Sequence, residues 1–121
     1  GDVTRLDELY QPDSFDLILC NEALSHFHDV PAFLRTAFAV LKPGGVLIVA
    51  DHSARAGDGI GVTKSLHRIE ESSLTREIEV AGFKRVESGE FLRHPEDRRD
   101  VIVFRAPTPV DEFVLKFQKP K

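Results

Sequence analysis

The stretch LKPGGVLIVADHS (residues 41–53) decides how this chain folds. Pro43 and the two glycines after it end a helix and permit a left-handed turn. Residues 46–50 are apolar without interruption, as in a strand that is buried inside a sheet. Asp51 and His52 follow at the end of this strand, where α/β proteins place their ligands. The stretch therefore predicts one side of a small-molecule site.

The residues before this stretch predict a strand and a helix. FDLILC (residues 15–20) is a second apolar run, and we expect a strand that is buried on both faces. Asp29 is placed to cap the following helix, and Pro31 fits its first turn. A helical stripe of apolar residues runs along it: Phe33, Leu34, Ala37, Phe38 and Leu41. The order strand–helix–strand predicts two parallel strands joined by a crossover.

The residues after the stretch predict a Gly-rich flexible loop, a helix and an antiparallel ending. The helix lies within residues 66–83, with Ser72 or Ser73 as its cap and Gly82 at its end. Residues 83–92 alternate like a strand, 93–100 form a charged, solvated loop, and 101–104 form a short strand or packed segment. Residues 112–120 form the last strand. The fold class is α/β, with a parallel start and an antiparallel C-terminal strand.

Composition limits the class of protein. The chain has 121 residues, which suits one domain over 1–121, and a formal net charge of −4, which argues against a nucleic-acid partner. No apolar run is long enough to cross a membrane, and residues 1–10 do not resemble a signal peptide. The single cysteine, Cys20, fits a reducing compartment and a place in the core. We expect a cytoplasmic protein.

The segment from GDVTRL (residues 1–6) through PDSFDLILC to LKPGGVLIVADHS resembles the second half of class I S-adenosylmethionine-dependent methyltransferases. The later segments LHRIEESSLTREIEVAGFKRV and DEFVLKFQKP are also similar to that family, so the resemblance covers nearly the whole chain. It implies a partial Rossmann-like sheet whose strands are equivalent to the fourth to seventh of seven. The last strand would run antiparallel between the fifth and sixth.

The resemblance also implies a cofactor, S-adenosylmethionine, and places Asp2 near its adenine amino group. The family holds this cofactor with a Gly-rich loop that opens a helix, and this chain has no such loop near its start. We therefore expect a truncated domain, by nature or as a fragment, or one that a second chain completes. Alone, it should bind the cofactor weakly or not at all.

Polar residues beyond the two predicted strands are the candidate site. We assign Asn21, Glu22 and His26 to cofactor binding, because they follow the strand 15–20. His52 and His67 are the candidate general bases, because imidazole accepts protons near neutral pH, and Asp51 is placed to orient a neighbouring histidine.

A metal is the alternative role for the histidines. His26 and His28, together with Asp51 and His52, would suit zinc or iron if they converged. Their spacing matches no specific metal motif, so we assign no metal.

Three functions fit this sequence. The first is methyl transfer from S-adenosylmethionine to a small molecule, in a fold that a partner or second subunit completes. The second is a small hydrolase that uses the His and Asp cluster, with or without metal. The third is a non-catalytic binding or assembly module. The strand 15–20 would lack a neighbour on one edge, so we expect a homodimer through that edge.

Overall fold

A computed structural model describes residues 13–21, 29–59 and 62–121 of the chain. It contains strands, α-helices and one short 3-10 helix, in the order β1 (Phe15–Asn21), α2 (Val30–Val40), β2 (Leu41–His52), α3 (Thr63–Leu66), α4 (Glu71–Val80), β3 (Lys84–Gly89), η3 (Val103–Arg105) and β4 (Glu112–Gln118).

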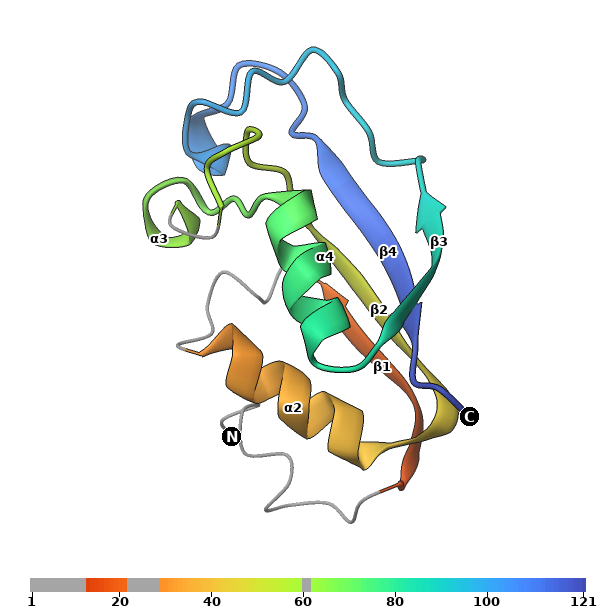
Figure 1. The fold of residues 1–121 in the computed structure, drawn as a ribbon. Helices are drawn as coiled ribbons and strands as arrows, with labels where there is room; N and C mark the ends of the chain where they lie inside the picture. Colours follow the sequence, from red (N-terminus) through yellow and green to blue (C-terminus); the bar gives the residue numbers. More distant parts are fainter. Residues whose placement is uncertain (1–12, 22–28, 60–61) are drawn as a thin grey trace.

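The four strands form one sheet in the order β1-β2-β4-β3 (Figure 1). β1 and β2 run parallel, whereas β4 runs antiparallel to both of its neighbours. The last strand of the chain is therefore inserted between β2 and β3, as the resemblance implies. The predicted α/β class, with its parallel start and antiparallel end, is confirmed.

The crossover helix α2 forms where its local signals place it. The Asp29 side chain accepts a hydrogen bond from the Ala32 N–H at 3.0 Å, which satisfies one of the free donors of the first turn. Phe33, Leu34 and Ala37 are buried against the sheet. The predicted cap is confirmed, and so is the apolar stripe up to Phe38; Leu41, its last predicted member, belongs to β2.

The strand β2 begins earlier in the chain than the sequence predicts, and it includes the turn after α2. β2 begins at Leu41 rather than at residue 46, because the backbone at Leu41 already pairs with Phe15. Gly44 has a φ of 82°, the left-handed region that glycine adopts without strain. A Cβ on Gly45 would lie 2.8 Å from the Lys42 carbonyl oxygen, so this turn admits only glycine there.

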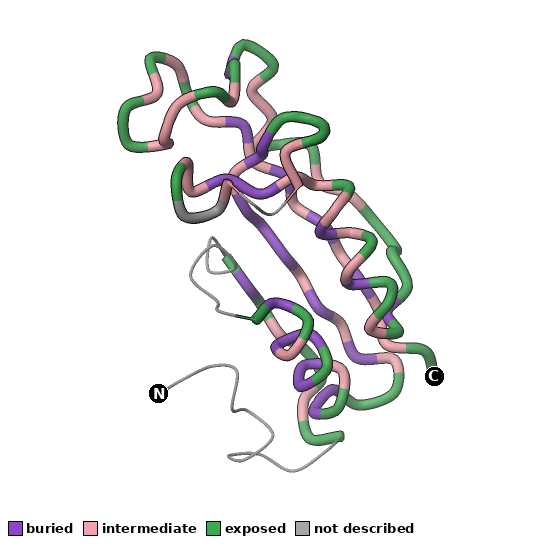
Figure 2. The backbone as a smooth tube through the Cα atoms, turned by 60° about the vertical axis from the view of Figure 1, so that its left-hand side comes forward, coloured by how far each residue is buried: buried purple, intermediate pink, exposed green. Residues whose placement is uncertain are grey.

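The two long helices α2 and α4 cover the same face of the sheet, and the opposite face carries no helix among the described residues (Figures 1 and 2). The helix-covered face buries the apolar side chains Leu47, Val49, Phe113, Leu115 and Phe117. The expectation that residues 15–20 are buried on both faces is wrong. Leu17 and Leu19 point to the uncovered face and are 54% and 67% exposed, whereas Cys20 points to the helices and is buried.

The helix α4 is capped in an unexpected way. It begins at Glu71, and its N-cap residue is Glu70 rather than Ser72 or Ser73. The Ser73 hydroxyl instead donates to the Glu70 carboxylate at 2.6 Å. The same carboxylate accepts from the N–H groups of Gly57 (2.6 Å) and Gly59 (3.1 Å), so the Gly-rich segment is tied to the start of α4.

The connection from β3 to β4 differs most from its prediction. β3 ends at Gly89 instead of residue 92. Of the two alternatives for residues 101–104, the strand is excluded, because these residues lead into the 3-10 turn η3. The charged loop 93–100 is not simply solvated, because Asp97 is only 7% exposed and is bound by Arg68.

No helix within the described ranges is both long and apolar enough to span a membrane.

Candidate functional site

The candidate site lies where the carboxyl ends of β1 and β2 meet the amino end of the antiparallel strand β4. Asn21 ends β1 and pairs in register with Ala50, and His52 ends β2 two residues further on. Side chains alternate between the two faces of a strand. Asn21 therefore shares the uncovered face with Leu17 and Leu19, and His52 lies on that face as well, on the neighbouring strand.

His52 is paired with a carboxylate that comes from the last strand. His52 and Glu112 lie opposite each other in the β2–β4 register, and the imidazole Nε2 is 3.5 Å from the Glu112 Oε1. Their side chains are 19% and 17% exposed, although the Glu112 Oε1 itself is shielded from solvent. A carboxylate beside an imidazole can orient the ring, as it does in many enzymes that use histidine as a general base.

Glu112 is the site residue that sequence reasoning missed. A usable signal existed, because the resemblance places the last strand antiparallel beside the strand that ends at His52. The start of that last strand then lies near the end of the strand that stops at His52. Only the register of the sheet turns this into a contact between named residues.

Asp51 lies on the opposite face from His52. Its side chain is fully buried on the helix-covered side, and one of its oxygens accepts the His52 backbone N–H at 2.8 Å. The carboxylate that faces His52 is therefore that of Glu112, while Asp51 holds the backbone. His26 and His28, the other members of the cluster predicted for a hydrolase, lie outside the described residues.

Ser53 continues the pairing of β2 and β4 just beyond the site. Its N–H donates to the Asp111 carbonyl at 2.9 Å, and its hydroxyl donates to the Asp111 carboxylate at 2.6 Å. The Asp111 carboxylate also accepts from the His94 N–H and from the guanidinium groups of Arg93 and Arg99. The neighbours of His52 and Glu112 in the sequence are thereby locked together.

A buried arginine, Arg68, holds Ser53 and the loop before β4 in place. Arg68 is fully buried and donates to the Ser53 carbonyl (3.0 Å), to the Val101 carbonyl (2.9 Å) and, through two N–H groups, to the Asp97 carboxylate (2.7 and 3.1 Å). Asp97 accepts the Asp111 N–H as well, at 2.9 Å. The loop between β3 and β4 is thus tied to the end of β2.

The two buried carboxylates of this network stay ionised because of their partners. Burial alone would raise the pKa of Asp97, but hydrogen bonds from Arg68 and from backbone N–H groups outweigh it and lower that pKa. Burial also opposes ionisation of Asp111, yet the Ser53 hydroxyl, the His94 N–H and two arginines leave its pKa below the ordinary value.

The remaining predicted residues divide into two groups. His67 lies outside the sheet, just after α3, with a φ of 54° and its ring tilted against Phe104 at 5.0 Å between centroids. Asp2, Glu22, His26 and His28 lie outside the described residues. Among the residues that the structure does describe, no group of three or more His, Cys, Asp or Glu side chains is arranged to hold a metal ion.

Comparison with known proteins shows the family of the chain. The family model described as a methyltransferase domain matches residues 1–104. The ubiquinone biosynthesis O-methyltransferase of Rhodopseudomonas palustris is 38% identical over 47 residues, which are 39% of this chain and 19% of that protein. The methyltransferase YcgJ of Bacillus subtilis, itself uncharacterised, is 27% identical over 108 residues, which are 88% of this chain and 41% of that protein.

A solved structure shares the fold. The SAM-dependent methyltransferase of Methanosarcina mazei superimposes with a TM-score of 0.71 at 18% identity, over 99% of this chain and 65% of that one. The chain therefore spans less than half of either curated relative and about two thirds of this structure. Since the family model covers most of its length, the chain belongs to the methyltransferase-domain family.

Proposed function

We propose that this chain takes part in the transfer of a methyl group from S-adenosylmethionine to a hydroxyl group of a small molecule, in an assembly completed by a second subunit. One observation carries the proposal: the His52–Glu112 pair at the carboxyl end of a central strand of a methyltransferase fold. A hydroxyl loses its proton when it is methylated, and His52 is placed to accept that proton. Glu112 then stabilises the imidazolium.

The described residues are better suited to act on the methyl acceptor than to bind the cofactor. A Gly-rich segment binds a cofactor through N–H groups that point to the ligand. Here the N–H groups of Gly57 and Gly59 are already bound to Glu70, so this segment offers no such cradle. The groups that hold S-adenosylmethionine must therefore come from residues other than 56–59.

A labelling experiment tests the proposed reaction. The chain is incubated with methyl-labelled S-adenosylmethionine and either catechol, which offers hydroxyl groups, or ethanolamine, which offers an amine. We expect label on catechol, at a rate per chain that rises with protein concentration because assembly is required. Absence of labelled product from both acceptors, at concentrations where the protein is assembled, would contradict the proposal.

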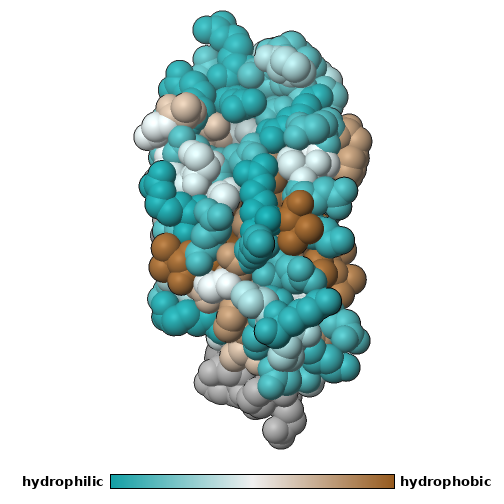
Figure 3. Space-filling model, turned by 45° about the vertical axis from the view of Figure 1, so that its right-hand side comes forward, coloured by the Kyte–Doolittle hydropathy of each residue, from teal (hydrophilic) through white to brown (hydrophobic). Residues whose placement is uncertain are grey.

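The second subunit in this proposal is another copy of the same chain, joined through β1. In the described part of the chain, β1 pairs only with β2, so its outer edge has no neighbouring strand. β1 contains no Lys, Arg or Pro that would discourage edge pairing. If two copies pair antiparallel about Ile18, Leu17 lies opposite the partner's Leu19, and the exposed leucines cover one another. The β3 side is a weaker candidate, because its surface is mostly hydrophilic with separate hydrophobic spots (Figure 3).

Light scattering across a dilution series tests the dimer. We expect a mass of twice 13.6 kDa at high micromolar concentration and a shift to the monomer on dilution. Leu19→Lys should shift the equilibrium to the monomer, because it places two like charges in the paired edge. Val80→Lys is the matched control, since Val80 is 83% exposed on α4, away from β1. A 13.6 kDa monomer throughout would refute the dimer.

We also propose a cytoplasmic location. The chain has a single cysteine, Cys20, which is buried in the core and has no second cysteine in the chain with which to form a disulfide. A protein with this cysteine content needs no oxidising compartment in order to fold. Fractionation of cells that express the protein at its natural level is the direct test.

A further inference from the structure

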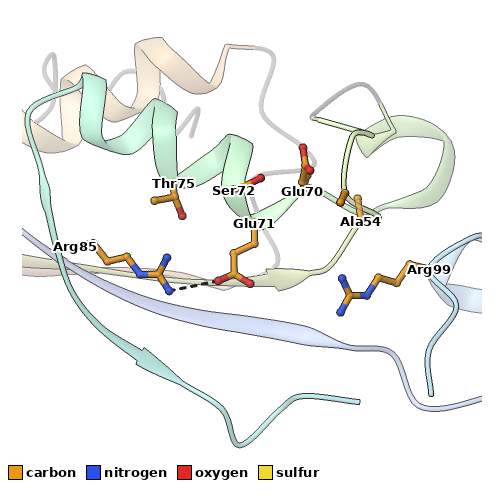
Figure 4. Close-up of a pocket in the computed structure, with 8 residues that line it drawn as sticks. Ala54, Glu70, Glu71, Ser72, Thr75, Arg85 and Arg99 are labelled. Carbon is orange, nitrogen blue, oxygen red and sulfur yellow. Dashed lines mark hydrogen bonds and ion pairs between the residues drawn. The ribbon is translucent and has the colours of Figure 1, made fainter. Parts of the chain in front are cut away.

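A cavity separate from the His52–Glu112 site lies beside the start of α4 (Figure 4). It has a volume of about 330 Å³, within the range of small-ligand sites. The segment after β2, the first turns of α4, the start of β3 and the loop before η3 all contribute to its wall. The lining residues that carry the argument are Glu70, Glu71, Thr75, Arg85 and Arg99.

Arg99 is held in an unfavourable backbone conformation that directs it to this cavity. Its φ is 62°, a left-handed value that costs energy for a residue with a side chain. Its N–H donates to Asp97 at 3.0 Å, and Asp97 is in turn fixed by the fully buried Arg68. Only one of the guanidinium nitrogens of Arg99, Nη2, is bound to Asp111, at 3.0 Å. Within residues 13–21, 29–59 and 62–121, the other guanidinium nitrogens have no hydrogen-bond partner.

Arg85 approaches the cavity from the opposite side. Figure 4 shows its guanidinium directed at Glu71, with Arg99 reaching in from the other end. The contact between Arg85 and Glu71 is long, 3.4 Å, because the other oxygen of Glu71 is bound more tightly by Arg93 at 2.6 Å. Arg85 and Arg99 are 37% and 32% exposed, so both guanidinium groups are accessible to a small molecule.

The balance of donors and acceptors shows which ligand would fit. The Glu70 carboxylate is already occupied by Gly57, Gly59 and Ser73. The Thr75 hydroxyl is shielded from solvent and has no hydrogen-bond partner within the part of the chain that the structure describes. The wall thus offers unused N–H and O–H donors, whereas its acceptors are already bound. A ligand that matches it has to be rich in acceptor oxygens.

We propose that this cavity binds a small organic anion, a carboxylate or a phosphate ester, between Arg85 and Arg99. Guanidinium groups bind both kinds of oxyanion through pairs of charge-assisted hydrogen bonds. The Thr75 hydroxyl donates a further bond. This site does not depend on the proposed methyl transfer, because none of its lining residues belongs to the His52–Glu112 pair.

Calorimetric titration of the full chain tests this site, with inorganic phosphate and succinate as separate probes in a buffer that contains neither class of anion. We expect saturable binding of at least one probe, and the tighter one identifies the ligand class. Arg85→Gln and Arg99→Gln should each weaken binding at least about tenfold, because each removes a charge-assisted contact. Arg85 makes no contact with the buried Arg68–Asp97 pair, so Arg85→Gln remains informative if Arg99→Gln impairs folding.

Two further variants separate this site from general attraction of anions. Arg98→Gln removes the same charge one residue from Arg99, but the Arg98 side chain is 83% exposed and does not line the cavity. It should leave the affinity within about twofold, as expected for screened surface charges. Glu71→Gln should tighten binding, because it removes a negative charge from the site. No saturable binding of either probe, equal losses in Arg98→Gln and Arg85→Gln, or weaker binding in Glu71→Gln would overturn the proposal.

Discussion

Replacing Arg68 by methionine is expected to lower the free energy of unfolding by about 3–5 kcal/mol, the range for breaking a buried ion pair. Arg68 is fully buried and donates to the Asp97 carboxylate and to the carbonyls of Ser53 and Val101. The variant leaves the Asp97 charge buried without its guanidinium partner. Because domains of this size are stable by roughly 5–15 kcal/mol, the loss is large. Urea denaturation followed by circular dichroism measures it.

Two comparisons show whether the loss comes from the buried pair. Arg98→Met removes an arginine that is 83% exposed, and it should change stability by less than about 0.5 kcal/mol. The double variant Arg68→Met/Asp97→Leu should recover part of the loss, because no unpaired charge remains buried. Equal losses in Arg68→Met and Arg98→Met would contradict the role of the pair.

The same network predicts how the stability of the fold changes at low pH. The pKa of Asp97 and that of Asp111 are lowered in the folded protein, so both carboxylates bind protons more readily when the chain is unfolded. Their stabilisation is therefore complete above the ordinary carboxylate pKa of about 3.9, and it is lost as the pH falls through the lower folded values. Asp97→Asn should flatten this acid limb of the stability curve.

His52→Ala is expected to reduce the rate of methyl transfer at least about a hundredfold, the low end for removal of a general base. The His52 side chain is 19% exposed, and its Nε2 faces the Glu112 Oε1 at 3.5 Å, so the proton of a bound acceptor would go to the other ring nitrogen, Nδ1. Glu112→Gln should give a smaller loss, because the base remains but its orienting charge is gone. The assay is the labelled methyl transfer to catechol, and added imidazole should restore part of the His52→Ala rate.

A second histidine provides a matched control. His94 also lies beside a glutamate, Glu96 at 3.2 Å, but on an exposed loop. His94→Ala should leave the rate within about twofold, since it removes no group of the site. Unchanged turnover in His52→Ala, with an unchanged circular dichroism spectrum, would place the base elsewhere in the molecule.

Much of the fold follows from local signals in the sequence. The Asp29 cap, the apolar stripe of α2 and the Gly-rich turn at Gly44 and Gly45 depend on residues only a few positions apart. Local sequence therefore determines them, and the structure confirms them. The position of β4 between β2 and β3 was expected from the family resemblance, since no local pattern specifies which strand an antiparallel strand joins.

Other features depend on contacts between distant parts of the chain. Ser53 binds Asp111 across 58 positions, and Arg68 binds Asp97 across 29. These contacts bury Asp97 in a loop whose composition predicts exposure to solvent. Glu70 takes the N-cap position of α4 that was predicted for a serine, but its side chain makes no capping hydrogen bond; its carboxylate accepts instead from two N–H groups of the preceding loop.

The sequence by itself determined the α/β class, the parallel pair of strands and the polar residues at their ends. Only the tertiary structure decided which of those residues work together. Alternation along β2 sends Asp51 into the core and His52 to the uncovered face, and the register with β4 brings Glu112 opposite His52. The physical reason is that register is set by pairing over the whole sheet, whereas a sequence pattern records only the neighbours of each residue.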